Sequence, residues 1–577
     1  MTNQDEPRPA RYSILLRKCV SLVHEDLAQT YSRDVQKWLL VAPIIGVVTG
    51  IIITLITIVI LRGAWAVLLP YYLSHHWAII PCMVGAFLVT GIIMQYLTPD
   101  PNEHSTEEII RSYHEHQGDI DVRPFWAKLA AAVTTVGTGG SAALEGPSIY
   151  AGGAIGSWLW TKLKHIRLEY RDRRIMLISG AAAGMASVFR APLTGLVFAL
   201  EMPYKDDLAH EALLPSLIAS VVAYATLVAF VGAEPLFGFV GEAHFAAIDL
   251  AWSALLGLMC GLASMVFAIT FRRVREFAVN LRLPHPLKLV IGGLLSALCG
   301  LFFIKLFPGR LIPLGPNYEA VNMVLTQRRG PTELACFAIL KLAATLFSLG
   351  FGGVSAMFVP LFLSGACIGS AYAQTIAQVP NYDLYAAVGM AAFIAGGYKT
   401  PLAAVVFVAE ATGGHSYLIP SLIGAAVAYA VSGEASVSGD QQTHEVTRIA
   451  ELGRMTVRDV MRTQVVSVLA ESTVREFAEG IATRHRHAVY PVYEGDRPIG
   501  IIGIWSLSKV PSDRWDDTRV RELTDRNLMI VPDDCDLSEA LRLLLTEHAH
   551  QLLMVTGPDG KPRGIVTKTD ILRSVQP

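Results

Sequence analysis

The sequence predicts a multi-pass all-α membrane protein followed by a small soluble α/β module. Three observations lead to this prediction: an apolar composition, an internal repeat in the apolar part, and a second repeat in the polar tail. Of the 577 residues, 52% are hydrophobic and the mean hydropathy is +0.43, as is typical of a chain that lies mostly in lipid. We assign a cytoplasmic segment, a transmembrane domain, a linker and two soluble repeats, at 1–36, 37–434, 435–454, 455–510 and 519–577.

Nearly uncharged stretches predict membrane helices, because a helix needs roughly 20 apolar residues to cross a bilayer. They lie at 38–61, 77–97, 213–231, 250–269, 287–303, 337–349 and 418–431. Shorter apolar segments broken by Gly and Pro lie between them, and these require protein or water around their free backbone groups. Basic residues before position 38 and the lack of a signal-peptide core predict a bacterial inner-membrane protein with its N-terminus and soluble module in the cytoplasm.

Several classes of function are excluded by composition and motifs. The net charge of -2 and the lack of a basic stripe argue against a nucleic-acid partner. The seven cysteines form no CxxC pair, so we expect neither a zinc site nor a disulfide framework. No HExxH or GxSxG motif lies in an apolar segment, so we do not expect an enzyme.

The polar tail contains a duplication. "MTVRDVMRTQVVSVLAESTVREFAEG" and "VRELTDRNLMIVPDDCDLSEALRLLL" each begin a unit with a short strand, an amphipathic helix and two strands around an Asp/Gly turn. This pattern resembles a tandem pair of CBS domains. The resemblance implies that Thr567 and Asp570 in "GIVTKTD" contact an adenine nucleotide, whereas the first copy has Gly503 and Ser506 at these positions. A pair used only for dimer contacts is the alternative, and "RHRH" and "EHAH" mark helix–strand joints rather than a metal site.

The apolar part is also repeated. Shifted by 213 residues, "GTGGSAALEGPSIYAGGAIGS" at 137–157 matches "GFGGVSAMFVPLFLSGACIGS" at 350–370 in nine of twenty-one positions. A shift of 209 places "RAPLTGLVFALE" on "KTPLAAVVFVAE". Transporters built from two such halves place their substrate site near the membrane midplane, where broken helices converge.

In both copies a glycine-rich run leads into a helix that starts near a proline, Pro147 or Pro360. The glycines allow a sharp turn and a close backbone approach. Free N–H groups and the helix dipole make such a start an anion site, and dipoles release an ion faster than a lysine or arginine would. The two starts together predict an anion cradle.

Glu145 is the carboxylate of the first copy, and Phe358 stands at the equivalent place in the second. At a helix start its carboxylate can occupy the position of a permeating anion and vacate that position when it is protonated or moves. We therefore predict that Glu145 is a gate, with a structural helix cap as the alternative. The repeated pair Glu201 and Glu410 is interpreted as structural.

"LEGP" and "AMFVP" resemble two motifs of the CLC family of chloride channels and transporters. The resemblance implies a CLC-type fold with two inverted repeats, roughly 77–232 and 286–434, and a homodimer with one pore per subunit. It also implies that small anions and membrane lipid are the partners and that no cofactor is required. Its implied anion-binding residues are Gly146, Met357, Phe358 and Val359, with Glu145 as the gate.

Other positions depart from the family pattern. The best match to a further family motif is "EHSTEE", which implies that His104 and Ser105 bind the anion and that Glu107 modifies selectivity, unless this acidic run is only a solvated loop. Ser438 stands where we expect the family's central tyrosine, and the resemblance implies that it binds the anion in place of that tyrosine. Met202 replaces the inner glutamate of proton-coupled members.

These departures favour channel-like or weakly coupled passage of small anions, gated by Glu145. The anion is chloride or another small anion such as bicarbonate or nitrate. A proton-coupled chloride or anion antiporter is the first alternative, and a CBS-bearing cation transporter is a more distant one.

Overall fold

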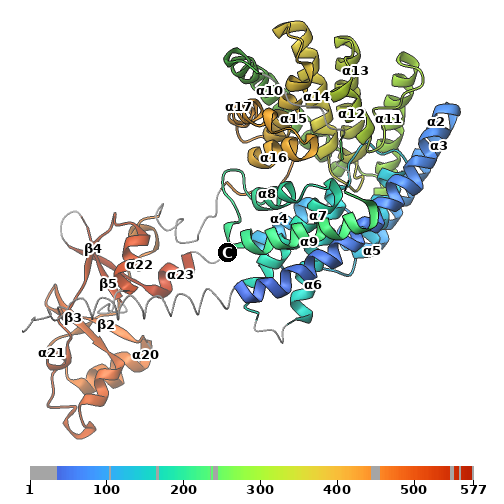
Figure 1. The fold of residues 1–577 in the computed structure, drawn as a ribbon. Helices are drawn as coiled ribbons and strands as arrows, with labels where there is room; N and C mark the ends of the chain where they lie inside the picture. Colours follow the sequence, from blue (N-terminus) through green and yellow to red (C-terminus); the bar gives the residue numbers. More distant parts are fainter. Residues whose placement is uncertain are drawn as a thin grey trace, which may run out of the picture. The chain divides into compact units, whose positions relative to one another are not determined.

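The computed structural model describes residues 35–102, 105–163, 168–233, 236–237, 245–443, 455–485, 487–545, 552–557 and 561–574. The chain forms two compact units, Met1–His444 and Glu445–Pro577, which are considered separately (Figure 1). Residues 435–443, assigned to the linker from the sequence, belong to the first unit. There the backbone of Gln442 accepts a hydrogen bond from the amide of Lys205, at 2.8 Å.

The described part of the first unit is helical, and its helices fall into two series with the same order. A segment at Val35–Ser74 comes first and contains η1 (Ile58–Trp65) and α2 (Ala66–Ser74). The first series is η2 (His76–Ala78), α3 (Ile79–Leu97), α4 (Ser105–Glu115), α5 (Phe125–Gly137), α6 (Glu145–Lys162), α7 (Asp172–Phe189), α8 (Pro192–Glu201), η3 (His210–Ala212) and α9 (Leu213–Val231).

The long helix α10 (Ala247–Asn280) separates the two series. The second series is α11 (His285–Leu306), α12 (Tyr318–Thr326), α13 (Pro331–Gly350), α14 (Phe358–Tyr372), η4 (Ala373–Ala377), α15 (Tyr382–Tyr398), α16 (Pro401–Thr412), η5 (His415–Tyr417) and α17 (Leu418–Val431). The core of the unit lies at α6, α7, α14 and α15, in which nearly every residue is buried.

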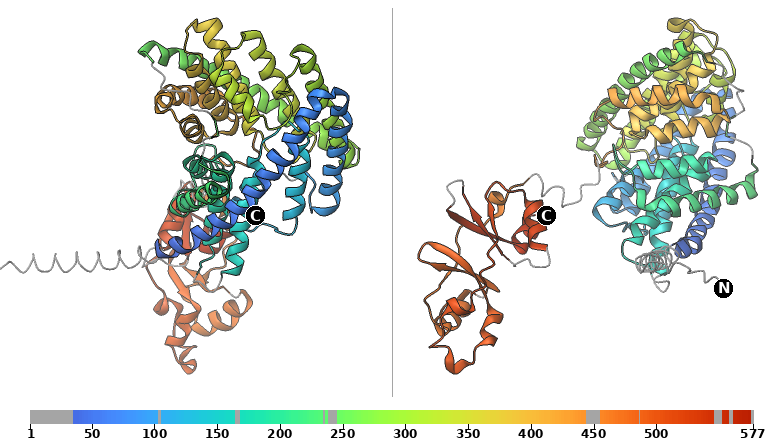
Figure 2. Two further views of the ribbon diagram at one scale, coloured as in Figure 1. Left: turned by 45° about the vertical axis from the view of Figure 1, so that its right-hand side comes forward. Right: turned by 60° about the vertical axis from the view of Figure 1, so that its left-hand side comes forward.

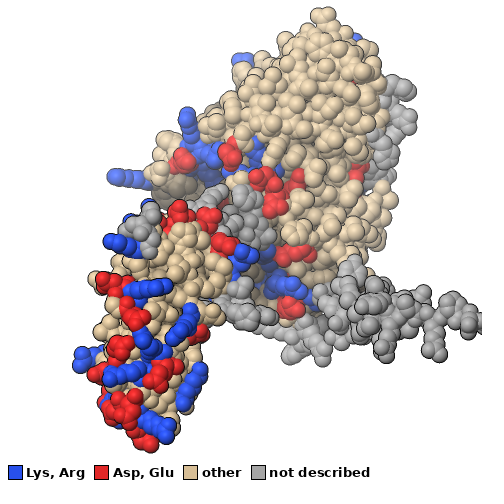
Figure 3. Space-filling view, turned by 90° about the vertical axis from the view of Figure 1, so that its left-hand side faces the viewer, with Lys and Arg blue, Asp and Glu red and all other residues tan. Residues whose placement is uncertain are grey.

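Seven helical segments among the described residues are long and apolar enough to cross a membrane. They are Val35–Ser74, His76–Leu97, His210–Val231, Ala247–Asn280, His285–Leu306, Pro331–Gly350 and Phe358–Ala377. On the face shown in Figure 3, large surfaces of the first unit carry no charged side chains, whereas the second unit carries many charged side chains of both signs. The prediction of a multi-pass helical membrane protein is confirmed.

The two series meet where their glycine-rich loops run antiparallel. Ala143 and Ala356, 213 positions apart, form an antiparallel bridge in which the Ala143 amide donates to the Ala356 carbonyl at 2.9 Å. The same shift relates the bond from the Ser141 amide to Ser348 Oγ and the bond from the Val354 amide to Thr135 Oγ1. Equivalent groups therefore exchange bonds across an approximate two-fold axis, as in an inverted repeat.

Helices α8 and α16 cap one another. Glu201, the last residue of α8, accepts hydrogen bonds from the amides of Leu402 and Ala403, at 3.0 and 2.7 Å, in the first turn of α16. Glu410 of α16 accepts bonds from two amides in the first turn of α8, at 2.9 and 2.7 Å. This geometry supports the structural interpretation of the repeated pair, because each carboxylate satisfies N–H groups that have no intrahelical partner.

Helices α6 and α7 pack at backbone distance through glycine, and α14 and α15 do the same. A Cβ atom on Gly152 would lie 1.9 Å from the Gly180 carbonyl oxygen, and one on Gly365 would lie 2.2 Å from that of Gly389. Small residues at such crossings let helices approach closely in the absence of a hydrophobic driving force. The central helices therefore tolerate no side chain at these crossings.

The second unit contains two sheets of three strands in the described residues (Figure 2). The first sheet has β1 (Val468–Leu469) parallel to β2 (Val489–Glu494), which is antiparallel to β3 (Arg497–Gly503). The second has β4 (Ile530–Pro532), β5 (Leu552–Thr556) and β6 (Pro562–Thr567) in the same arrangement. The helical segments are α19 (Val457–Val460), η6 (Glu476–Ala482), α20 (Thr483–His485), η7 (Ile504–Lys509), η8 (Ser512–Arg514), α21 (Val520–Leu523), α22 (Leu537–Leu545) and α23 (Lys568–Ser574). The predicted duplicated α/β module is confirmed.

We expect Gly152→Ala to lower the free energy of unfolding by about 1–3 kcal/mol, because the added methyl group overpacks the α6–α7 crossing. Gly85→Ala in α3 is the matched control, since nothing lies within 4 Å of its added Cβ. That variant should remain within about 1 kcal/mol of the original chain. Thermal unfolding of purified protein in detergent measures both, and equal melting of the two variants would contradict the packing argument.

Candidate functional site

The first turn of α14 faces Glu145, the first residue of α6. The bridge between Ala143 and Ala356 lies directly before both helices and places their N-termini opposite each other. Glu145 Oε1 accepts a hydrogen bond from the Phe358 amide at 2.5 Å, and the side chain is completely buried. Glu145 Oε2 is among the buried oxygens of the described residues that have no hydrogen-bond partner. The carboxylate thus sits where an anion would meet the free amides of α14.

Gly146 and Val359 are the second residues of α6 and α14. Their amides belong to the first turns, in which N–H groups have no intrahelical acceptor. Met357 directly precedes α14, and its amide donates to the hydroxyl of Tyr398 at 3.1 Å. The amides predicted to bind the anion are therefore brought together around Glu145, while their role in binding stays a prediction.

Two tyrosines that the sequence analysis missed lie beside Glu145. Tyr398 ends α15 and Tyr318 begins α12, and both interact electrostatically with the Glu145 carboxylate. Tyr398 brings a buried hydroxyl to the site from a helix other than the segment in which the central tyrosine was expected. The expectation that Ser438 replaces that tyrosine stays a prediction.

Aromatic rings surround Phe358, the residue that takes the place of Glu145 in the second repeat. Its ring lies 5.0–6.0 Å from the ring centroids of Phe189, Phe198, Phe362, Tyr398 and Phe407. These contacts hold the start of α14 in a dry environment. Electrostatic interactions with its amides are stronger there than in water.

From Ser105 onward, the acidic run of the predicted family motif is helical rather than a solvated loop. Helix α4 begins at Ser105, and both carboxylates of its first turn are paired: Glu107 with Arg275 and Glu108 with Lys128. Glu107 Oε1 lies 2.5 Å from Arg275 Nη1, so its charge is offset by a cation. His104 and the side chain of Ser105 lie outside the described residues.

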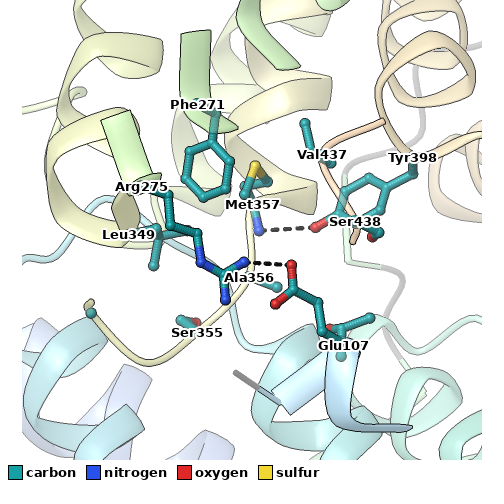
Figure 4. Close-up of a pocket in the computed structure, with 12 residues that line it drawn as sticks. Glu107, Phe271, Arg275, Leu349, Ser355, Ala356, Met357, Tyr398, Val437 and Ser438 are labelled. Carbon is teal, nitrogen blue, oxygen red and sulfur yellow. Dashed lines mark hydrogen bonds and ion pairs between the residues drawn. The ribbon is translucent and has the colours of Figure 1, made fainter. Parts of the chain in front are cut away.

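A cavity of about 40 Å³ lies between the start of α4 and the start of α14 (Figure 4). Its lining includes three positions predicted from the sequence, Glu107, Met357 and Ser438, together with Arg275 and Tyr398. The Ser438 amide donates to Ser436 Oγ at 3.2 Å and is therefore not available to an anion. The Ser438 side chain remains a predicted anion contact at the cavity wall.

Met202 is the residue that we expect to stand at the position of the inner proton-carrying glutamate. The side chain is buried, and its backbone carbonyl accepts a bond from Gln441 Nε2 at 3.0 Å. Methionine does not titrate, and the carboxylate of the preceding Glu201 is engaged in capping α16. Neither residue offers a free carboxylate at this position.

In the second unit, Thr567 and Asp570 bond to one another. Thr567 Oγ1 donates to Asp570 Oδ2 at 2.6 Å, and Arg462 Nε donates to Asp570 Oδ1 at 2.7 Å. Burial acts to raise the pKa of the Asp570 carboxyl, but hydrogen bonds from Thr567 and Arg462 hold it below its usual value. Contact of these residues with an adenine nucleotide stays a prediction.

Family models match both units. The model described as voltage gated chloride channel matches residues 85–433, and the CBS domain model matches 457–513 and 520–577. A eukaryotic CLC transporter structure superposes with a TM-score of 0.60 at 18% identity, over 93% of this chain and 98% of that one. A CLC-type fluoride/proton antiporter superposes with a TM-score of 0.61 at 23% identity, over 70% and 97%.

Curated relatives carry names of both channels and exchangers. A chloride/fluoride channel protein of Pseudomonas syringae pv. tomato is 29% identical over 59% of this chain and 73% of its own length. An H(+)/Cl(-) exchange transporter ClcA of Yersinia pseudotuberculosis is 25% identical over 67% and 82%. With the family model spanning more than half of the sequence and the inverted repeats in place, the chain belongs to the CLC family of voltage-gated chloride channels and related anion transporters, and it carries a C-terminal CBS pair.

Proposed function

We propose that this protein conducts small anions through a pore gated by Glu145, with channel-like or weakly proton-coupled transport. The observation that supports this proposal best is the bond from the Phe358 amide to Glu145 Oε1. A permeating anion needs the same N–H groups, so the carboxylate and the anion compete for one position. Neutralising or moving the carboxylate frees this position.

Weak coupling is supported by the lack of a free carboxylate at the position where we expect a proton-coupled relative to have a second proton site. Met202 carries no proton, and both oxygens of Glu201 accept backbone bonds from α16. A proton that reaches Glu145 from one side therefore meets no free carboxylate at this position to carry it further. Tight proton-coupled antiport is the second candidate, because several relatives are named as proton exchangers.

The anion is chloride or another small anion such as bicarbonate or nitrate. Fluoride joins this set because two of the similar proteins are named for it. Main-chain amides at helix starts recognise negative charge without a fixed ligand shape, so the cradle alone accepts both halides and oxyanions.

Anion flux from reconstituted vesicles, with internal pH recorded, tests the mode of transport. We expect an imposed chloride, bicarbonate, nitrate or fluoride gradient to collapse with little or no uphill proton movement. Stoichiometric proton movement driven by a chloride gradient would establish the antiporter instead. Absence of flux for all four anions would contradict the proposal.

Glu145→Gln tests the gate. A neutral amide does not compete with the anion, so flux at neutral pH should rise on the order of tenfold, which corresponds to a barrier lower by about 1.4 kcal/mol. Flux through the original chain should rise as pH falls, whereas flux through the variant should stay constant. Glu319→Gln, which neutralises an exposed carboxylate of the same unit, is the control. The same pH dependence in both variants would remove Glu145 as the gate.

A further inference from the structure

In the membrane unit, a second carboxylate, that of Glu107, binds both a cation and a backbone amide. Glu107 Oε1 accepts a bond from Arg275 Nη1 at 2.5 Å (Figure 4). It also accepts a bond from the Gly439 amide at 3.2 Å. These partners lie 168 and 332 residues away along the chain. The oxygen therefore joins the start of α4, the last turns of α10 and the segment that follows α17.

The ion pair lies between two cavities. The lining of the cavity of about 40 Å³ includes Met357 and Tyr398, the residues that lie next to the start of α14 and to Glu145. A larger cavity of about 310 Å³ includes the exposed residues Arg272 and Glu276 in its lining. Glu107 and Arg275 line both, so the pair forms the partition between the inner site and the surface.

Arg275 is also held without Glu107. Its Nη2 donates to the Asn102 carbonyl at 3.2 Å, which anchors the guanidinium to backbone. A guanidinium presents five N–H donors, so it has donors left for a further acceptor. The cation therefore stays at the partition when the carboxylate leaves it.

The neighbouring ion pair of Glu108 and Lys128 is more deeply buried than the Glu107–Arg275 pair. The side chains of Lys128 and Glu108 are 3% and 9% exposed, whereas those of Arg275 and Glu107 are 24% and 13% exposed. Opening a partly hydrated pair costs less than opening a buried one, because water compensates the separated charges. Of these two ion pairs, the Glu107 pair lines both cavities described above and is the more exposed to water.

Extending the anion pathway proposed above, we propose that the Glu107–Arg275 pair is an inner gate at which a permeating anion replaces the Glu107 carboxylate on Arg275 and on the Gly439 amide. Glu107 Oε1 marks the position of this anion. The two donors meet on a single oxygen, so either a halide or one oxygen of an oxyanion fits there. The pathway then has a tethered carboxylate at each end, Glu145 on the Phe358 amide and Glu107 on Arg275.

The Glu107 carboxylate also explains how Arg275 can line the pathway without trapping the permeating anion. A lone guanidinium would hold an anion strongly, but competition from Glu107 reduces the net affinity of the position. The pair therefore attracts the anion to the partition and then releases it.

Four variants in reconstituted vesicles test this inner gate: Glu107→Gln, Arg275→Met, the combination of both, and Arg273→Met as control. Arg273 lies on the same turn of α10, is exposed, and lines neither cavity described above. Flux is recorded against chloride and nitrate concentration, so that the half-saturating concentration and the maximal rate are obtained separately.

Glu107→Gln should lower the half-saturating anion concentration and the maximal rate together, because the competitor of the anion is gone. Arg275→Met leaves the carboxylate uncompensated and should reduce flux by about tenfold. The double variant should recover flux relative to Arg275→Met, since it removes the repelling charge. Arg273→Met should match the original chain in both parameters.

Unchanged half-saturation and maximal rate in Glu107→Gln would overturn the inner gate, even where Arg275→Met fails to fold. Folding is checked by thermal unfolding and size-exclusion chromatography in detergent. The Glu145→Gln result separates the two proposals. A pH-independent flux in that variant together with unaltered Glu107 variants would leave the pore standing and remove the inner gate, whereas no anion flux in the original chain would remove the pore itself.

Discussion

The antiparallel contact between the two glycine-rich loops is the constraint on which the site depends. The backbone bond between Ala143 and Ala356 fixes the direction in which α6 and α14 begin. Gly139 and Gly352 have φ angles of 118° and 105°, and a side chain would strain either position. These two glycines are therefore required by the backbone conformation of the loops that lead into α6 and α14, and the position of the amides that face Glu145 depends on these loops.

The helix starts at the site contribute main-chain dipoles and no full charges, so the full charges near the site belong to side chains. Glu145 adds a negative charge, and the Glu107–Arg275 pair adds one charge of each sign. A cradle of amides binds weakly, so small changes in these side chains alter occupancy without any change in the fold. This separation lets one scaffold serve members that are named as channels and members that are named as exchangers.

Much of the fold and part of the site could be predicted from the sequence. The 213-residue shift predicted two equivalent helix starts, and the structure places Glu145 and Phe358 opposite each other. Arg275 could not be predicted, because it lies in α10, outside the two repeated series, and its partner is 168 residues away. Tyr398 could have been found from the repeat, because the 209-residue shift pairs it with Phe189. These residues end α15 and α7, and both place an aromatic ring against Phe358.

The reciprocal caps of α8 and α16 have a consequence for biosynthesis. The carboxylate of Glu201 reaches its amides 201 residues later in the chain, and Glu410 returns to amides that were synthesised long before it. Until α16 has emerged from the ribosome, the first repeat holds an unpaired carboxylate and an uncapped helix start, which are costly to leave in lipid. These two capping interactions of the first half can therefore form only after the second half has been synthesised.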